Sequence, residues 1–190
     1  MELFSELGTH RSQAGWPDPP SGSVFAEQEN VDEERRHPDR AFTPQMMING
    51  QQQTLRWDCT HPLHTVRKEE QPSKLIIHII SATTRGDMLD VEFSVSGSLA
   101  ERGADVFAVL ADDTASLIAP HGRDSDPTLS HVSIARTITR VGTLQTESEK
   151  PFLIPLSAAV LLPPSRGRHL ILFAQAPGFG RMLGLDTKPL

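Results

Sequence analysis

The densest group of chemically active side chains lies in a short segment after residue 57. Asp58, Cys59, His61 and His64 are all of residue types that bind metals. Structural zinc sites take two or more thiolates from separate turns of the chain, and Cys-x-His-x-x-His is not one of their spacings. Cys59 is the only cysteine, so it has neither a disulfide partner nor a second thiolate beside it. We therefore expect a solvated loop here, with no metal and no cofactor.

Hydroxyl, imidazole and carboxylate groups also occur together near residue 130. Ser130, His131 and Ser133 follow a polar, acidic loop at residues 121–127. Neighbouring strand residues point to opposite faces of a sheet, so Ser130 and His131 should diverge. The chain has no Gly-x-Ser-x-Gly nucleophile motif, and the loop offers fewer oxygens than the roughly six to eight that calcium takes. The sequence favours a capped turn and a strand over a hydrolase or a calcium site.

The turn chemistry of residues 40–50 predicts a hairpin. Thr43 precedes a proline, which pushes its backbone toward an extended conformation, and Thr43-Pro44 is the kind of bond that is commonly cis. A short apolar run follows and ends at Asn49 and Gly50, which both tolerate positive φ. We expect a strand that ends in a two-residue hairpin turn.

Composition places the chain among globular proteins. Its 190 residues are 37% hydrophobic and 22% charged, with a formal net charge of -6. An acidic chain with no tyrosine and two tryptophans lacks the basic stripe and the stacking rings of a nucleic-acid binder. No apolar run approaches the roughly 20 residues of a membrane span, and nothing at the N-terminus resembles a signal peptide. We expect neither nucleic acid nor a membrane as a partner.

From residue 73 onward the pattern is typical of short strands separated by turns. A half-buried strand is indicated by alternation of apolar and polar residues at 89–95. Residues 74–82, 104–111 and 168–176 are apolar at nearly every position, as central strands are. Together these runs predict an antiparallel sandwich of about seven or eight strands.

Two further segments complete the expected organisation. Residues 130–141 form a longer β-branched run, on which Arg136 and Arg140 are expected to share one face with the neighbouring apolar residues. Before residue 73 the pattern allows short helices at 23–36 and 63–70, and Gln71-Pro72-Ser73 is typical of a linker. We expect two domains, residues 1–72 and residues 73–190.

Several motifs spread along the chain resemble motifs of one known protein family. They are Arg40 to Gly50 (with Thr43-Pro44-Gln45 and Asn49-Gly50), Gly15-Trp16-Pro17-Asp18-Pro19, Phe25-Ala26-Glu27-Gln28, Ala104-Asp105-Val106, residues 122–136 and Leu183-Gly184. They resemble a bacterial family of thioredoxin-like secreted proteins of unknown function. The resemblance covers most of the chain. It implies an α+β fold, with an incomplete thioredoxin-like N-terminal part followed by an antiparallel β-sandwich.

The resemblance also implies that the redox motif of that family is degenerate here. Residues 2–8 match the approach to the family's Cys-x-x-Cys, and Thr9 and Ser12 then occupy the two cysteine positions. Thiol–disulfide exchange needs a thiolate and a resolving thiol, and alcohols supply neither. A residual binding groove would involve Thr43, Pro44 and Trp16.

Two functions follow from these observations. The leading one is a redox-inactive, non-catalytic protein that acts, if at all, by binding a peptide or another protein. The alternative is a one-thiol thiol–disulfide oxidoreductase in which His61 and His64 stabilise the Cys59 thiolate. The resemblance implies a periplasmic or secreted protein, whereas the lack of a signal peptide in this chain favours the cytoplasm. Uncovered sheet edges would favour a homodimer.

Overall fold

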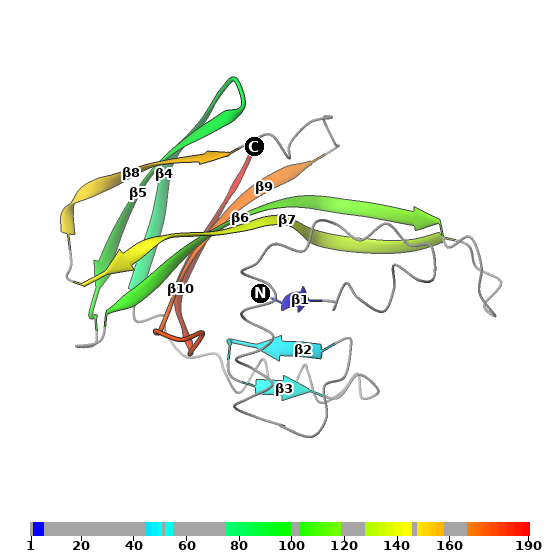
Figure 1. Cartoon of the computed structure of the whole chain (residues 1–190), viewed down its shortest axis with the longest axis horizontal. Coiled ribbons are helices and arrows are strands. Elements are labelled where there is room, and N and C mark those ends of the chain that lie inside the picture. The colour runs from blue at the N-terminus through cyan, green and yellow to red at the C-terminus, as the bar shows by residue number, and fades with distance from the viewer. Residues whose placement is uncertain are drawn as a thin grey trace.

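The computed structural model describes residues 2–5, 45–50, 52–54, 75–99, 103–118, 128–145, 148–157 and 167–190. Within these ranges every regular element is a β-strand and none is a helix (Figure 1). The expected α+β class is therefore wrong, and the described part of the chain is all-β. The helices expected at 23–36 and 63–70, and the boundary after residue 72, lie outside these ranges and stay predictions. None of the described segments forms a helix of the length and apolarity that a membrane span needs.

The described segments of the first part form a small antiparallel sheet instead of a mixed αβ unit. Strands β1 (Glu2–Ser5), β2 (Gln45–Ile48) and β3 (Gln52–Thr54) lie in that order. Asn49 and Gly50 connect β2 to β3 with φ angles of 57° and 70°, which confirms the predicted hairpin. Because Ile48 pairs with Gln52, the loop holds one residue more than the expected two.

The rest of the described chain forms two antiparallel sheets. One has the strand order β10-β9-β6-β7 and the other the order β4-β5-β8. The strands are β4 (Leu75–Arg85), β5 (Met88–Gly97), β6 (Ala104–Ile118), β7 (Thr128–Leu144), β8 (Ser148–Ser157), β9 (Arg168–Gln175) and β10 (Met182–Pro189). The β-rich character expected of this part of the chain is confirmed.

The two sheets pack face to face on a shared apolar core. Leu89, Val91, Phe93 and Val95 of β5 are buried, as their alternation predicted. They pack in one cluster with alternate residues of the larger sheet, such as Val106 and Leu172, and we call the faces that form this cluster the inner faces. Burying each such side chain stabilises the fold by about 1.5–3 kcal/mol, as an upper estimate.

Strand β4 differs from its expected role. Its apolar run predicted a central strand, but β4 lies at the edge of the smaller sheet and only alternate residues are buried. Ile76 and Ile80 lie on the other face and are 64% and 40% exposed. The apolar run therefore does not mean burial on both faces: the inner face of β4 is buried, and none of the described residues covers its outer face.

Strands β6 and β9 occupy the middle of the larger sheet and are buried on both faces, as their apolar runs predicted. On the outer face a second apolar cluster forms, in which the Phe107 and Phe173 rings stack with centroids 5.1 Å apart. Phe179, in the β9–β10 turn, adds a tilted ring 5.9 Å from Phe107. These two strands therefore form the rigid centre of the sandwich.

The β2–β3 hairpin contacts the end of β9, the β9–β10 turn and the start of β10. The Met182 amide donates to the Asn49 carbonyl over 3.1 Å. A Cβ atom added to Gly50 would lie 2.6 Å from the Gly180 carbonyl oxygen and 2.9 Å from Gln175 Nε2. Only glycine fits a position that combines positive φ with so close an approach.

We predict that Gly50→Ala lowers the free energy of unfolding by more than the roughly 1–2 kcal/mol that left-handed backbone costs an alanine. The matched control is Gly86→Ala, because Gly86 has a φ of 63° but no atom within 4 Å of an added Cβ. Thermal unfolding of both variants isolates the contact with Gly180, at about 2–4 °C per kcal/mol. If both variants lose the same free energy of unfolding, the close contact between the hairpin and the β9–β10 turn is not what makes Gly50 necessary.

Candidate functional site

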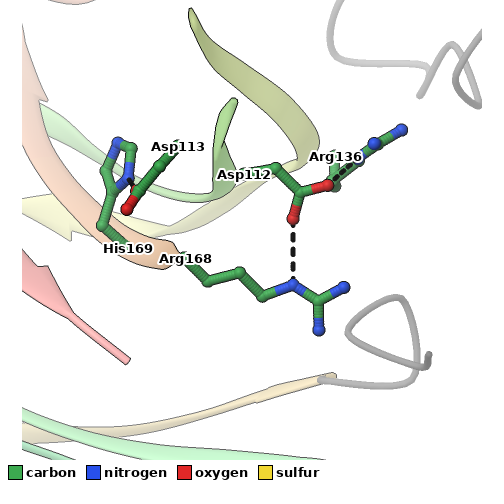
Figure 2. Close-up of polar contacts among 5 residues, drawn as sticks. All are labelled: Asp112, Asp113, Arg136, Arg168 and His169. Carbon is green, nitrogen blue, oxygen red and sulfur yellow. Dashed lines mark hydrogen bonds and ion pairs between the residues drawn. The ribbon is translucent and has the colours of Figure 1, made fainter. Parts of the chain in front are cut away.

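A polar cluster extends the apolar centre of the larger sheet where β6, β7 and β9 run side by side. Asp112 and Asp113 are adjacent in β6, and Arg168 and His169 are adjacent in β9. Adjacent strand residues point to opposite faces. Each strand therefore contributes one side chain to the inner face and one to the outer face, and Figure 2 shows the resulting pairs as separate groups.

On the inner face, Asp112 binds two guanidinium groups. Arg136 Nε lies 2.7 Å from Oδ2 and Arg168 Nε lies 2.9 Å from Oδ1, so each carboxylate oxygen accepts one charge-assisted bond (Figure 2). The side chains of Asp112 and Arg168 are only 4% and 12% exposed. Low exposure strengthens these bonds and makes loss of one partner costly. The three residues fasten β6 to both of its neighbours.

Arg136 reaches the inner face because β7 is bulged. Leu110 pairs with Thr137 and Ala111 with Ala135, which leaves Arg136 as an extra residue between them. Arg140 pairs with Phe107, a residue of the outer cluster, and bonds Asp105 Oδ1 over 2.6 Å, and a second bulge follows it at Val141. The expectation that the two arginines share one face was therefore wrong, since period-two alternation does not continue through a bulge.

On the outer face, three side chains form a chain of hydrogen bonds. His169 Nδ1 lies 2.5 Å from Asp113 Oδ1, and Ser133 Oγ lies 3.0 Å from His169 Nε2. A neutral imidazole that donates from Nδ1 to Asp113 accepts the Ser133 hydroxyl proton at Nε2. Asp113 is 50% and His169 18% exposed, and Ser133 is exposed. The arrangement is that of a hydroxyl, a base and a group that orients the base.

The histidine that Ser133 contacts is not its near neighbour in the sequence. His131 is its near neighbour, but its side chain lies outside the described residues, as does that of Ser130. The structure brings His169 from 36 residues away and Asp113 from β6. The signal available in the sequence was only that Asp112-Asp113 ends one apolar run and that Arg168-His169 begins another.

The other predicted site residues lie outside the described ranges. They are Thr9, Ser12, Trp16, Thr43, Pro44 and Cys59, together with Asp58, His61, His64 and residues 121–127. Their roles stay predictions. Among the described residues, no group of three or more His, Cys, Asp or Glu side chains is arranged to hold a metal ion.

The geometry can be set beside known proteins. Residues 10–175 match the sequence model of a family described as "Protein of unknown function (DUF1223)". The chain belongs to the DUF1223 family. The match identifies a family of unknown function, as the resemblance implied, and says nothing about a thioredoxin-like fold or secretion.

One solved structure supports the fold of this DUF1223 protein, and two others align only weakly. A crystal structure of a protein from Agrobacterium tumefaciens aligns with a TM-score of 0.57 and 16% identity, over 91% of this chain and 73% of that one. OgpA from Akkermansia muciniphila aligns with a TM-score of 0.38 and 11% identity, over 64% of this chain and 28% of that one. A β-glucosidase from Kluyveromyces marxianus aligns with a TM-score of 0.30 and 12% identity, over 62% of this chain and 14% of that one. No curated protein matches in sequence.

We predict that Asp112→Asn destabilises the protein by about 3 kcal/mol, because it leaves the largely buried Arg168 and the half-buried Arg136 without the carboxylate that both contact. The matched control is Asp90→Asn, which breaks a 3.0 Å ion pair with Arg85, whose side chain is 82% exposed. Such surface pairs contribute about 0–1 kcal/mol. Urea unfolding at constant m-value measures both, and similar losses would contradict the structural role of Asp112.

Proposed function

We propose that this DUF1223 protein is redox-inactive and binds an extended peptide or protein segment along β7, which is an edge of the larger sheet among the described strands. The observation that carries the proposal is the difference between the sheet edges. The larger sheet ends in β10 and β7, and the smaller sheet ends in β4 and β8. An edge strand presents unpaired N–H and C=O groups that another strand can use, so natural sheets protect their edges.

The edges β4 and β10 protect each other. The Ile79 amide of β4 donates to Asp186 Oδ2 of β10 over 2.8 Å, and Lys188 Nζ donates to the Ile80 carbonyl over 3.5 Å. A Cβ added to Gly184 of β10 would collide with the Leu75 carbonyl group. The two strands close one side of the sandwich and leave no room for a further strand between them.

The edge β8 is protected by its composition. Pro151 and Pro155 both lie within the strand, and proline has no N–H to donate. Proline on an edge strand interrupts the ladder that an added strand would need. A long, regular addition at β8 is therefore disfavoured.

Among the described residues, the edge β7 has neither a facing edge strand nor a proline, and its bulges at Arg136 and Val141 limit a regular strand addition to residues 128–135 and 137–140. It is 17 residues long, contains no proline and pairs with β6 alone among the described strands. Its exposed side chains include Val132, which is 72% exposed, and Thr139. β-branched residues on an open edge suit strand addition, in which backbone bonds give affinity and alternate side chains give specificity.

The redox half of the proposal rests on residue types. Cys59 is the only cysteine, and the family resemblance puts Thr9 and Ser12 at the two cysteine positions. Without a resolving thiol, a mixed disulfide cannot be released within the chain. Thr43, Pro44 and Trp16 remain proposed as further binding residues.

For the binding role, we expect a capped peptide of about eight residues, alternating Thr and Val, to protect alternate β7 amides from hydrogen exchange within residues 128–135 or 137–140, the stretches that the bulges leave regular, since only alternate amides face an added strand. The same peptide with a central proline should bind several-fold more weakly. Thr139→Lys should weaken binding, whereas Ser157→Lys on β8 should not.

The binding role would be refuted if the protected amides lay outside β7, or if the peptide with the central proline protected the β7 amides as well as the peptide without it. Concentration-dependent self-association with the same alternate protection would instead assign the edge to a second copy of this chain. Analytical ultracentrifugation without peptide separates these two occupants.

For the redox role, we expect insulin to be reduced by a dithiol no faster with the protein than without it, and no effect of Cys59→Ser on that rate. The competing one-thiol oxidoreductase requires a lowered thiol pKa, so it predicts rapid alkylation of Cys59 by iodoacetamide at mildly acidic pH. Turnover that Cys59→Ser abolishes would establish that alternative.

A further inference from the structure

We propose that Ser133, His169 and Asp113 form a serine-nucleophile site that hydrolyses activated carboxylic esters. This activity goes beyond the proposed binding role and does not depend on it. The relevant contacts are 3.0 Å from Ser133 Oγ to His169 Nε2 and 2.5 Å from His169 Nδ1 to Asp113 Oδ1. Nucleophile, base and orienting carboxylate thus meet in the order and through the atoms that acyl transfer requires.

The backbone at Ser133 is unusual for a strand. Its φ of 54° is in the left-handed region, which non-glycine residues seldom adopt. Asp112 pairs with Ile134 and Thr114 pairs with Val132, so Ser133 lies opposite Asp113 between two paired positions. Backbone strain of this kind persists where the surroundings impose it and gathers at functional sites. The strain therefore gives an independent reason to assign a role to Ser133.

The position of Asp113 is also imposed by its neighbours. Its amide donates to the Gly167 carbonyl over 3.0 Å. Gly167 has a φ of 78°, and a Cβ added there would lie 2.9 Å from Asp113 Cγ and 3.1 Å from its Cβ. The carboxylate occupies the space that a side chain at residue 167 would take. Gly167 is accordingly a positioning residue for Asp113.

The chemistry balances with water as the only co-reactant. Ser133 Oγ attacks the ester carbonyl carbon and its proton passes to His169 Nε2. The tetrahedral intermediate loses its alkoxide, which takes that proton and leaves as the alcohol. Water then repeats the sequence on the acyl-serine and releases the carboxylic acid and free Ser133. Asp113 holds the ring and stabilises the imidazolium in both halves.

The exposure of the site limits its substrates. Half of the Asp113 side chain is accessible to solvent, and Ser133 is exposed. Water screens charges that develop in an open site, so an electrophile with a good leaving group is needed. We expect hydrolysis of aryl esters and no cleavage of amides.

The test uses the full chain and a fluorophosphonate probe, which forms a stable bond with an activated serine. We expect one label, located on Ser133 by mass spectrometry. His169→Gln should slow labelling about 10²-fold, as loss of a general base does. Asp113→Asn should slow it by at least about 10²-fold, because the imidazole then takes the wrong tautomer, and Gly167→Ala should slow it less than either change.

The negative control for the nucleophile is Ser133→Gly, which suits a φ of 54° and so removes the hydroxyl without straining the backbone. It should lose the label while unfolding at the wild-type temperature or above. Gly86→Ala, in an open turn away from the site, controls for alanine at positive φ and should label at the wild-type rate. Absence of label, label on another residue, or labelling of His169→Gln at the wild-type rate would overturn the proposal. None of these outcomes bears on peptide binding, which needs no serine chemistry.

Discussion

The described structure depends on one constraint, the alternation of side chains along β6. This strand is hydrogen-bonded on both sides, to β9 and β7, and both its faces are buried over most of its length. Its even-numbered residues from Ala104 to Leu110 enter the core between the sheets, and Phe107 and Val109 enter the outer cluster. At the end of the apolar run the same alternation continues into Asp112 and Asp113, and it sends one carboxylate to each face.

Because they lie on opposite faces, Asp112 and Asp113 have different roles. Asp112 meets two guanidinium groups on the inner face, where little solvent reaches, and holds three strands together. Asp113 meets an imidazole on the outer face, where solvent and small molecules have access. An ion pair with two arginines neutralises a buried carboxylate, whereas a carboxylate beside histidine orients a base. The structure therefore has a structural acid and a chemically useful one at consecutive positions.

Sequence patterns predicted the elements whose burial follows a simple period. The alternation at 89–95, the apolar runs at 104–111 and 168–176, and the Asn49-Gly50 turn all appear where expected. The run at 74–82 predicted a central strand and β4 is an edge strand, because an apolar sequence does not reveal which neighbours a strand will have. The α component of the expected fold came from a family resemblance, and the described segments of the first part pair as strands instead.

The candidate site could not be predicted from short sequence patterns. Ser133, His169 and Asp113 come from three strands, and His169 lies 56 residues from Asp113 in the chain. Their meeting depends on strand order, on a distorted backbone at Ser133 and on a glycine at 167 that leaves room for the carboxylate. The bulge at Arg136 likewise overturned a face assignment that assumed unbroken alternation. Order and bulges are tertiary properties, and one sequence without its fold does not specify them.

The measurement that tests this account most directly is equilibrium unfolding of Asp112→Asn beside Asp113→Asn. The two substitutions are chemically identical and adjacent, so any difference reports the faces on which the carboxylates lie. The account predicts a loss of about 3 kcal/mol for Asp112→Asn and of less than about 1 kcal/mol for the half-exposed Asp113. Equal losses, or a larger loss for Asp113→Asn, would contradict the division between a structural and a chemical carboxylate.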